Sequence, residues 1–255
     1  MRRASLFLCA CAVAACAGQP PPRPVAPLPA APELRLAAVR TQEDQIRSLR
    51  ARFRSVTRLP GTERSADGVL LVAKPDRFRL RLMLPLGLTV FDLLSVGDQT
   101  WIALPLADST QRQRDDAFAA FSRDDLGATF LRGAYAFPGT CVAAAGSDDE
   151  VLVRCAVDGV TRRTLRIGSA GIIEETSFEA GEPRLRVRYA DYRTVGGVSV
   201  PFRITLEYPQ RQQTVDIAIE DYEVNPALSA AAFAPPPDTA PQPAGAAIGA
   251  PDRRS

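Results

Sequence analysis

The stretch RFRLRLML, from Arg77 to Leu84, decides the fold class of this 255-residue chain. Its apolar residues alternate with arginines, so an extended backbone presents one apolar side and one charged side. This alternation predicts a β-strand with one buried and one hydrated face, which is typical of antiparallel sheets. The same pattern recurs in four later segments, at residues 164–167, 184–189, 202–208 and 214–219.

Two helices are expected beside these strands. A possible cap at Thr41 and an apolar stripe through Leu49 and Phe53 predict a helix over about residues 41–53. A second helix is predicted over about residues 122–132. Long strands, two helices and no strand-helix-strand rhythm together predict an α+β fold with one antiparallel sheet.

The strand at Arg77 runs into a turn whose pairing follows from side-chain chemistry. A four-residue loop over residues 85–88 places Arg81 opposite Asp92 on the hydrated side and Leu86 near the tip. A three-residue loop would instead set Asp92 on the buried face, where a carboxylate is costly. The preferred register also pairs Leu82 with Phe91 and Leu80 with Leu93.

A second hairpin is centred on Asp148. This register sets Cys141 opposite Cys155 and Ala143 opposite Val153, and it predicts a cross-strand disulfide. The alternative is a pair of buried free thiols. An exported protein favours the disulfide, because disulfides persist outside the cytoplasm.

Export is indicated by the N-terminus. Residues 1–15 combine two arginines, an apolar run and small residues, as a secretory signal does, and the ending Val-Ala-Ala-Cys resembles a bacterial lipobox that makes Cys16 the acylated residue. Ordinary signal cleavage nearby, with an incidental Cys16, is the alternative. Proline-rich flanks then predict a tether over residues 16–38, a folded domain over residues 39–233 and a disordered tail over residues 234–255.

The composition excludes several function classes. The chain has no histidine, so histidine-dependent triads, general bases and zinc sites are ruled out, and we expect no catalytic residue, metal or cofactor. Adjacent carboxylates such as Glu174 and Glu175 point to opposite faces of a strand and do not by themselves build a site. Loss of Arg2 and Arg3 with the signal leaves 29 basic and 29 acidic residues, which offers no electrostatic case for nucleic acid.

The sequence from Pro75 to Leu93, with an Asp-Arg-Phe-Arg-Leu strand running into Pro-Leu-Gly-Leu-Thr, resembles LolB, a family of outer-membrane lipoprotein receptors. Weaker similarity covers about residues 40–233, and the segment 221–228 resembles the wider LolA/LolB-like family of lipoprotein carriers. The cysteine hairpin, the proline-rich tail and the Asn-Pro-Ala-Leu ending depart from the close family.

The resemblance implies a half-barrel of about eleven strands, closed by a few helices over a hydrophobic cavity for acyl chains. It implies that Leu86, with Leu88 beside it, forms an exposed loop that delivers cargo into the membrane. The alternative is that Leu86 is a turn leucine packed on its own hairpin. On this basis the cavity is expected to be lined by the apolar residues of the alternating strands, namely Phe78, Leu80, Leu82, Phe91, Leu93, Leu185, Val187 and Tyr189.

The predicted function is therefore that of a monomeric, non-enzymatic lipoprotein, anchored by lipid to the outer membrane and facing the periplasm. It would bind lipids or acylated lipoproteins, receive them from a LolA-type periplasmic carrier and help insert them into the membrane. Two alternatives remain open: a lipid-binding envelope sensor on the same fold, and a structural or assembly lipoprotein with a filled core and no ligand.

Overall fold

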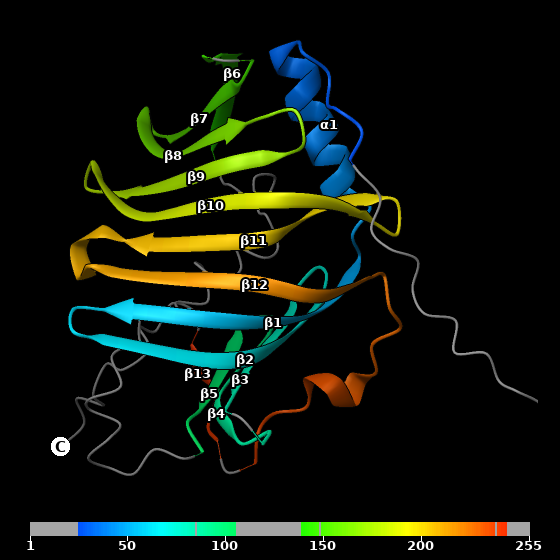
Figure 1. Cartoon of the computed structure of the whole chain (residues 1–255), viewed down its shortest axis with the longest axis vertical. Coiled ribbons are helices and arrows are strands. Elements are labelled where there is room, and N and C mark those ends of the chain that lie inside the picture. The colour runs from blue at the N-terminus through cyan, green and yellow to red at the C-terminus, as the bar shows by residue number, and fades with distance from the viewer. Residues whose placement is uncertain (1–24, 85, 106–138, 148, 238, 244–255) are drawn as a thin grey trace, which may run out of the picture.

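The structure is a computed structural model that describes residues 25–84, 86–105, 139–147, 149–237 and 239–243. A single α-helix lies against a large, curled sheet in this part of the chain (Figure 1). None of the helices in these ranges is long and apolar enough to cross a bilayer. In chain order the elements are α1 (Pro32–Asp44), β1 (Ser48–Leu59), β2 (Thr62–Ala73), β3 (Arg77–Met83), β4 (Thr89–Val96), β5 (Gln99–Ala103), β6 (Thr140–Ala145), β7 (Val151–Val157), β8 (Val160–Ile167), β9 (Ile172–Glu179), β10 (Glu182–Val195), β11 (Val198–Tyr208), η1 (Pro209–Arg211), β12 (Gln213–Val224), η2 (Ala230–Phe233) and β13 (Gln242–Pro243).

The strands form one open antiparallel sheet. Their order is β13-β5-β4-β3-β2-β1-β12-β11-β10-β9-β8-β7-β6, so nearly every strand pairs with its neighbour in sequence. The pairing of β1 with β12 joins a first wing, β1–β5, to a second wing, β6–β12. The predicted α+β class is confirmed, with twelve main strands and the two-residue β13 in place of about eleven.

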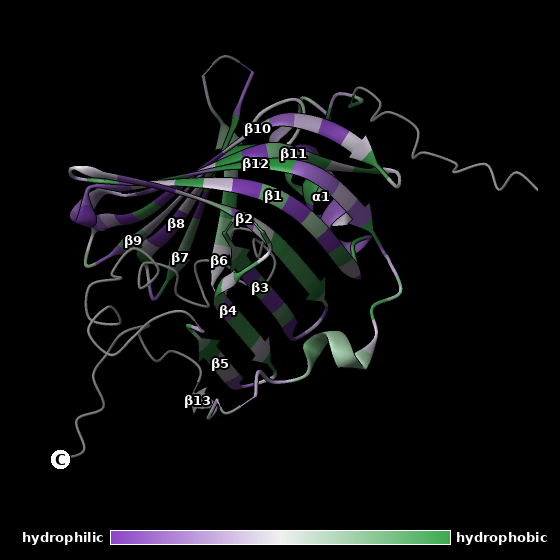
Figure 2. Ribbon diagram, turned by 60° about the horizontal axis from the view of Figure 1, so that its bottom comes forward, coloured by the Kyte–Doolittle hydropathy of each residue, from purple (hydrophilic) through white to green (hydrophobic). Residues whose placement is uncertain are grey.

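The two faces of the sheet differ in polarity. Apolar side chains alternate with charged ones along most strands, which appears as bands of colour in Figure 2. One face, which we term the inner face, carries the main apolar core, and the opposite outer face carries most of the arginines. Alternation along an antiparallel strand produces this division directly.

Helix α1 packs against the inner face of the second wing. Leu36 and Val39 are buried in the main core, and the helix contacts β6, β7 and β11. Arg35 is also buried, where its guanidinium donates to the backbone carbonyl oxygens of Pro29 and Asp149 and pairs with the Asp149 carboxylate. These contacts fix the helix to the turn between β6 and β7.

The predicted helix over residues 41–53 is wrong. The helix lies earlier, at Pro32–Asp44, and β1 begins at Ser48. Leu49 and Phe53 fit a helical stripe, but they also alternate with arginines, and the extended form buries both while pairing β1 with β2 and β12. The boundary at residue 39 is also too late, because Leu28 and Leu36 belong to the core. The helix predicted over residues 122–132 lies outside the described residues.

The predicted disordered tail begins too early. Beyond Phe233 the chain continues along the outer face of the first wing, and Gln242–Pro243 pairs with β5. Phe233 packs there with Leu94 and Trp101 in a second, smaller core. A short strand can pair with the edge of β5 despite the surrounding prolines because only two residues take part. Residues 244–255 lie outside the described ranges.

Gly68 in β2 leaves room for an aromatic ring on the inner face. It lies opposite Phe53 in β1 and Leu82 in β3. A Cβ atom at this glycine would come within 2.1 Å of the Phe53 ring. The missing side chain therefore allows the Phe53 ring to lie over β2 on the inner face of the first wing.

Candidate functional site

The inner face is an almost continuous apolar surface that spans both wings. The structure places all the residues that we expected to line a cavity on this face, buried in one core cluster: Phe78, Leu80, Leu82, Phe91, Leu93, Leu185, Val187 and Tyr189. Five come from β3 and β4 and three from β10. Their common burial brings distant parts of the sequence together; their contact with a ligand remains a prediction.

The inner face also contains a buried ion pair that the sequence analysis missed. Arg163 in β8 and Glu175 in β9 lie 2.6 Å apart between Nη2 and Oε1, with 7% and 2% of their side chains exposed. Counting by two from the buried Leu165 would have placed Arg163 on the same face. Glu175 requires the β8–β9 register, which sets it directly opposite Leu165.

Further polar side chains lie towards the same end of the strands. Tyr208 ends β11, Gln213 begins β12 and Thr57 lies near the end of β1, and all three are buried. Tyr208 pairs with Gln213 across the strands. Thr57 pairs with Val215, which lies two residues after Gln213 in β12. The inner face therefore has a partly polar end and a strongly apolar remainder.

The loop between β3 and β4 presents three exposed leucines. The exposed fractions of Leu84, Leu86 and Leu88 are 39%, 98% and 52%. The amide of Leu84 donates to the carbonyl of Leu88 at 2.9 Å, and the amide of Gly87 donates to the carbonyl of Leu84 at 3.1 Å. Leu86 adopts a φ of 77°, which is uncommon for a residue with a side chain. Its exposure contradicts packing of this leucine on its own hairpin.

The hairpin register is confirmed. Arg81 pairs with Asp92, and the two apolar pairs expected around them are present. A shift between Leu82 and Met83 makes Thr89 the partner of Met83, so the loop is one residue longer than predicted. Met83 pairs in turn with Asp67, which places the leucine loop towards the end of the sheet where β1 turns into β2.

The disulfide between Cys141 and Cys155 is also present, with the predicted register that pairs Ala143 with Val153. Cys155 is fully buried and lies directly opposite Arg163 of β8. The cross-link therefore fastens the edge strand β6 beside the buried ion pair. Cys16, the predicted lipidation site, lies outside the described residues.

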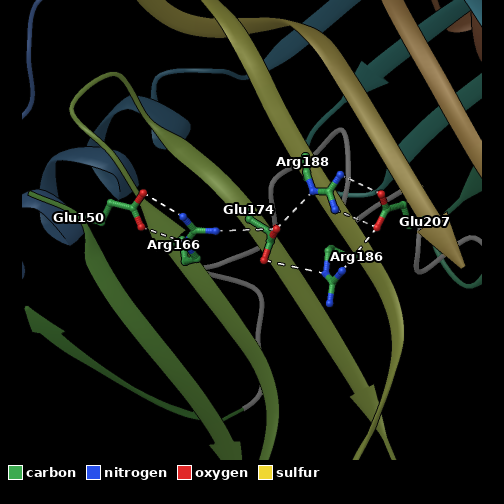
Figure 3. A network of polar contacts seen from close by, with 6 residues as sticks. All are labelled: Glu150, Arg166, Glu174, Arg186, Arg188 and Glu207. Atoms are coloured by element: carbon green, nitrogen blue, oxygen red, sulfur yellow. Dashed lines mark hydrogen bonds and ion pairs between the residues drawn. The ribbon is translucent and has the colours of Figure 1, made fainter. Parts of the chain in front are cut away.

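The outer face of the second wing carries a ladder of ion pairs (Figure 3). Six residues alternate in charge across β8, β9, β10 and β11 and the turn before β7: Glu150, Arg166, Glu174, Arg186, Arg188 and Glu207. Both guanidinium contacts from Arg166 to Glu150 measure 2.9 Å, and this hydrogen bonding lowers the pKa of Glu150. The charges balance, so the ladder makes the outer face hydrophilic without a strong net charge.

The outer face of the first wing differs because the chain after β12 covers it. Arg79 donates to both carboxylate oxygens of Asp92, at 2.9 and 2.7 Å, and to the carbonyl oxygens of Ala232 and Ala234. Arg81 adds a third contact to Asp92 at 3.0 Å. The expected hydrated position of Asp92 is therefore wrong, since only 8% of its side chain is exposed.

Comparison with solved structures identifies the fold. The chain is similar to a domain described as an outer membrane lipoprotein-sorting protein from Vibrio parahaemolyticus, with 11% identity, a TM-score of 0.58 and coverage of 78% of this chain and 95% of that chain. It is similar to a LolA superfamily protein from Nitrosomonas europaea, with 16% identity, a TM-score of 0.55 and coverage of 78% and 96%. A DUF1329 family protein from Desulfovibrio piger gives 10% identity, a TM-score of 0.58 and coverage of 77% and 97%.

No protein-family model matches the sequence, and no curated protein matches it significantly. The likeness therefore concerns the fold, which is of the LolA-like type. It does not single out the LolB family.

Proposed function

We propose that this protein is an outer-membrane lipoprotein, anchored through Cys16, that holds acyl chains against its inner face and helps insert acylated proteins into the membrane. The observation that carries the proposal is the loop of exposed leucines, which projects from the same two strands that supply much of the apolar inner face. Exposed leucine side chains are unfavourable in water and favourable in a bilayer. The LolA-like fold of lipoprotein-sorting and LolA superfamily structures supports the same role.

The proposed activity depends on apolar contact and needs no catalytic residue. An acyl chain of about 16 carbons costs on the order of 12 kcal/mol to expose to water, at about 0.8 kcal/mol per CH₂. A carrier must therefore offer an apolar path from its donor to the bilayer. The inner face would hold the chain, and Leu86 and Leu88 would enter the membrane surface beside it.

The partners follow from this path. A soluble LolA-type carrier in the periplasm would deliver the acylated protein, and the lipid at Cys16 would keep the receiver at the outer membrane. The protein would act as a monomer, and the proline-rich segment that follows Cys16 would tether the folded domain to the membrane. A lipid-binding sensor would share the ligand but not the delivery step, whereas a structural lipoprotein would bind no acyl chain.

Ligand binding is tested with the full chain carrying Cys16→Ala, which removes the predicted lipid anchor. Native mass spectrometry should show a co-purified or added acyl lipid, and a dansyl-labelled fatty acid should bind with blue-shifted emission. A protein that repeatedly carries no acyl species and also refuses the labelled fatty acid would be a structural lipoprotein, and the proposal would be abandoned.

Delivery is tested separately with Leu86→Glu. We expect at least a tenfold slower transfer of a fluorescent triacylated lipopeptide to phosphatidylethanolamine/phosphatidylglycerol vesicles, because burying one leucine contributes roughly 1.5–3 kcal/mol and a buried carboxylate costs more. Binding of the lipopeptide should change less than about twofold. Val160→Glu, at an exposed position at the start of β8, is the matched control. Equal transfer rates for both variants would remove the insertion role but leave lipid binding intact.

A further inference from the structure

The buried pair of Arg163 and Glu175 lies at the partly polar end of the inner face. Glu175 lies between Leu165 on one neighbouring strand and Val187 on the other, and both are fully buried. The same row continues through Leu206 and Val215 to Thr57. A carboxylate therefore replaces the apolar residue that this row would otherwise present.

Stability alone does not require an ion pair at a buried position. Removing two charges from water is costly, and well-packed apolar residues of similar volume often serve as well or better in such positions. Several other charges of the second wing avoid the cost by lying on the outer face, as Glu174 does immediately beside Glu175. A pair held on the face that we propose as the acyl-binding surface therefore suggests a role in binding.

The chemistry of the pair defines what it can bind. Arg163 supplies N–H donors and Glu175 supplies carboxylate acceptors, and together they carry no net charge. A neutral group that both donates and accepts hydrogen bonds suits this arrangement. An anionic group would be repelled by Glu175 and would bring an uncompensated charge into an apolar site.

We propose that Arg163 and Glu175 form a polar subsite for the uncharged glyceryl-ester head of an acylated ligand. This inference rests on the proposed function, since it concerns the ligand of the same inner face. The head would lie near Tyr208 and Gln213, and the acyl chain would extend along the apolar rows towards Phe53.

The location of the subsite fits delivery through the leucine loop. The row that contains Glu175 reaches Thr57 and its partner Arg64, close to the turn between β1 and β2. The leucine loop follows Met83, which pairs with Asp67 near the same end of the sheet. The head of a ligand at Glu175 would thus lie towards the end of the strands from which the leucines project.

The test replaces both charges with apolar residues, Arg163→Met with Glu175→Leu, in the full chain carrying Cys16→Ala. The matched control makes the same changes on the outer face, Arg166→Met with Glu150→Leu. Displacement of the uncharged dye N-phenyl-1-naphthylamine would report the affinities of 1-monopalmitoylglycerol and of palmitate, which have the same acyl chain. Circular dichroism and thermal unfolding would verify that each variant is folded.

We expect the protein with its Arg163–Glu175 pair intact to bind monopalmitoylglycerol with about tenfold higher affinity than palmitate, equivalent to about 1.4 kcal/mol. The inner-face variant should lose this preference while binding the dye and palmitate within about threefold of normal, and the outer-face control should retain it. A synthetic lipopeptide with the same glyceryl esters distinguishes the source of the head. If the inner-face variant binds both the lipopeptide and the acylglycerol more weakly, the subsite serves acylated proteins. If only its binding of the acylglycerol weakens, the subsite serves free lipids.

An unchanged preference in a folded inner-face variant would overturn the subsite and leave the proposed function standing. Refusal of the dye and of every lipid by the protein with its pair intact would instead overturn the proposed function, and the subsite with it. If the apolar variant does not fold, the exchange Arg163→Glu with Glu175→Arg keeps both charges and tests the same ligand preference. A preference retained in the exchanged variant would argue against a specific arrangement of donor and acceptor.

Discussion

Among the described residues, two ion pairs are buried in this sheet, one on each face, and their surroundings differ. Arg79 and Asp92 lie on the outer face, where Arg81 and the carbonyl oxygens of Ala232 and Ala234 complete a network that fastens the C-terminal segment to the first wing. Arg163 and Glu175 lie on the inner face, with Cys155 and Leu165 among their cross-strand neighbours. The first pair joins two parts of the structure, whereas the second lies on the surface proposed to hold a ligand.

The comparison shows that burial alone does not give an ion pair its role. Each pair carries a desolvation cost, and what offsets it depends on the groups nearby. For Arg79, hydrogen bonds to two backbone carbonyls and two carboxylate oxygens supply a structural reason. For the inner-face pair, a bound ligand is the proposed reason, and the following variants test this division.

The largest effect is expected from Asp92→Ala. It would leave Arg79 buried without its carboxylate partner, which costs about 3–5 kcal/mol in the free energy of unfolding. Urea unfolding followed by circular dichroism measures this loss. The control is Asp221→Ala, whose exposed partner Arg52 is 3.9 Å away and should contribute less than about 1 kcal/mol. Equal losses in the two variants would contradict a structural role for the outer-face pair.

A smaller effect should separate the two pairs when both partners become apolar. Arg79→Met with Asp92→Leu should lower the free energy of unfolding by about 2 kcal/mol, because the carbonyl oxygens of Ala232 and Ala234 lose their donor. The corresponding inner-face variant should change it by less than about 1 kcal/mol.

Hydrogen exchange of residues 228–237 provides a second measurement of the same contrast. The variant with Arg79→Met and Asp92→Leu should exchange faster in this segment, because the segment loses its attachment to the first wing. The inner-face variant should not alter exchange in this segment. Similar stability losses and similar exchange for both variants would show that the two pairs have the same structural role.

The smallest effect concerns an exposed pair, Glu150 and Arg166. Hydrogen bonding from Arg166 lowers the pKa of Glu150 below its ordinary value of 4.5 in the folded state. A lowered pKa gives stability that is present above the ordinary value and is lost as the pH falls through the folded value. Glu150→Gln should therefore cost less than about 1 kcal/mol at neutral pH, and the difference from the parent should vanish in acid.

Salt and pH together check this exposed pair. The cost of Glu150→Gln should shrink as the ionic strength rises, because salt screens exposed charges. Carbon-13 NMR titration of the Glu150 carboxyl should give a midpoint below that of an exposed glutamate. A midpoint at or above the ordinary value would contradict the contribution of Arg166.

The sequence predicted features that depend on near neighbours. The β3–β4 register follows from the cost of placing Asp92 on an apolar face, and the register at Cys141 and Cys155 follows from one short turn. The segment around Leu49 and Phe53 was assigned to the wrong element because its spacing satisfies both a helix and a strand. Its alternation with arginines favours a strand, and its pairing partners β2 and β12 were not part of the local pattern that suggested a helix.

The candidate site was predictable only in part. The leucine loop and the apolar residues of β3, β4 and β10 could be named from alternation and family resemblance. The Arg163–Glu175 pair could not, because its geometry requires the β8–β9 register as well as the identity of the inner face.

The sequence by itself determined an antiparallel sheet with one apolar face, because alternation at period two leaves an extended chain few other ways to bury its apolar residues. The tertiary structure decided which charges lie inside. Asp92 is buried beneath the chain that returns over the first wing, and Glu175 is buried on the inner face between Leu165 of β8 and Val187 of β10. Burial and partner choice depend on segments far apart in the chain, so they arise only when the whole sheet is assembled.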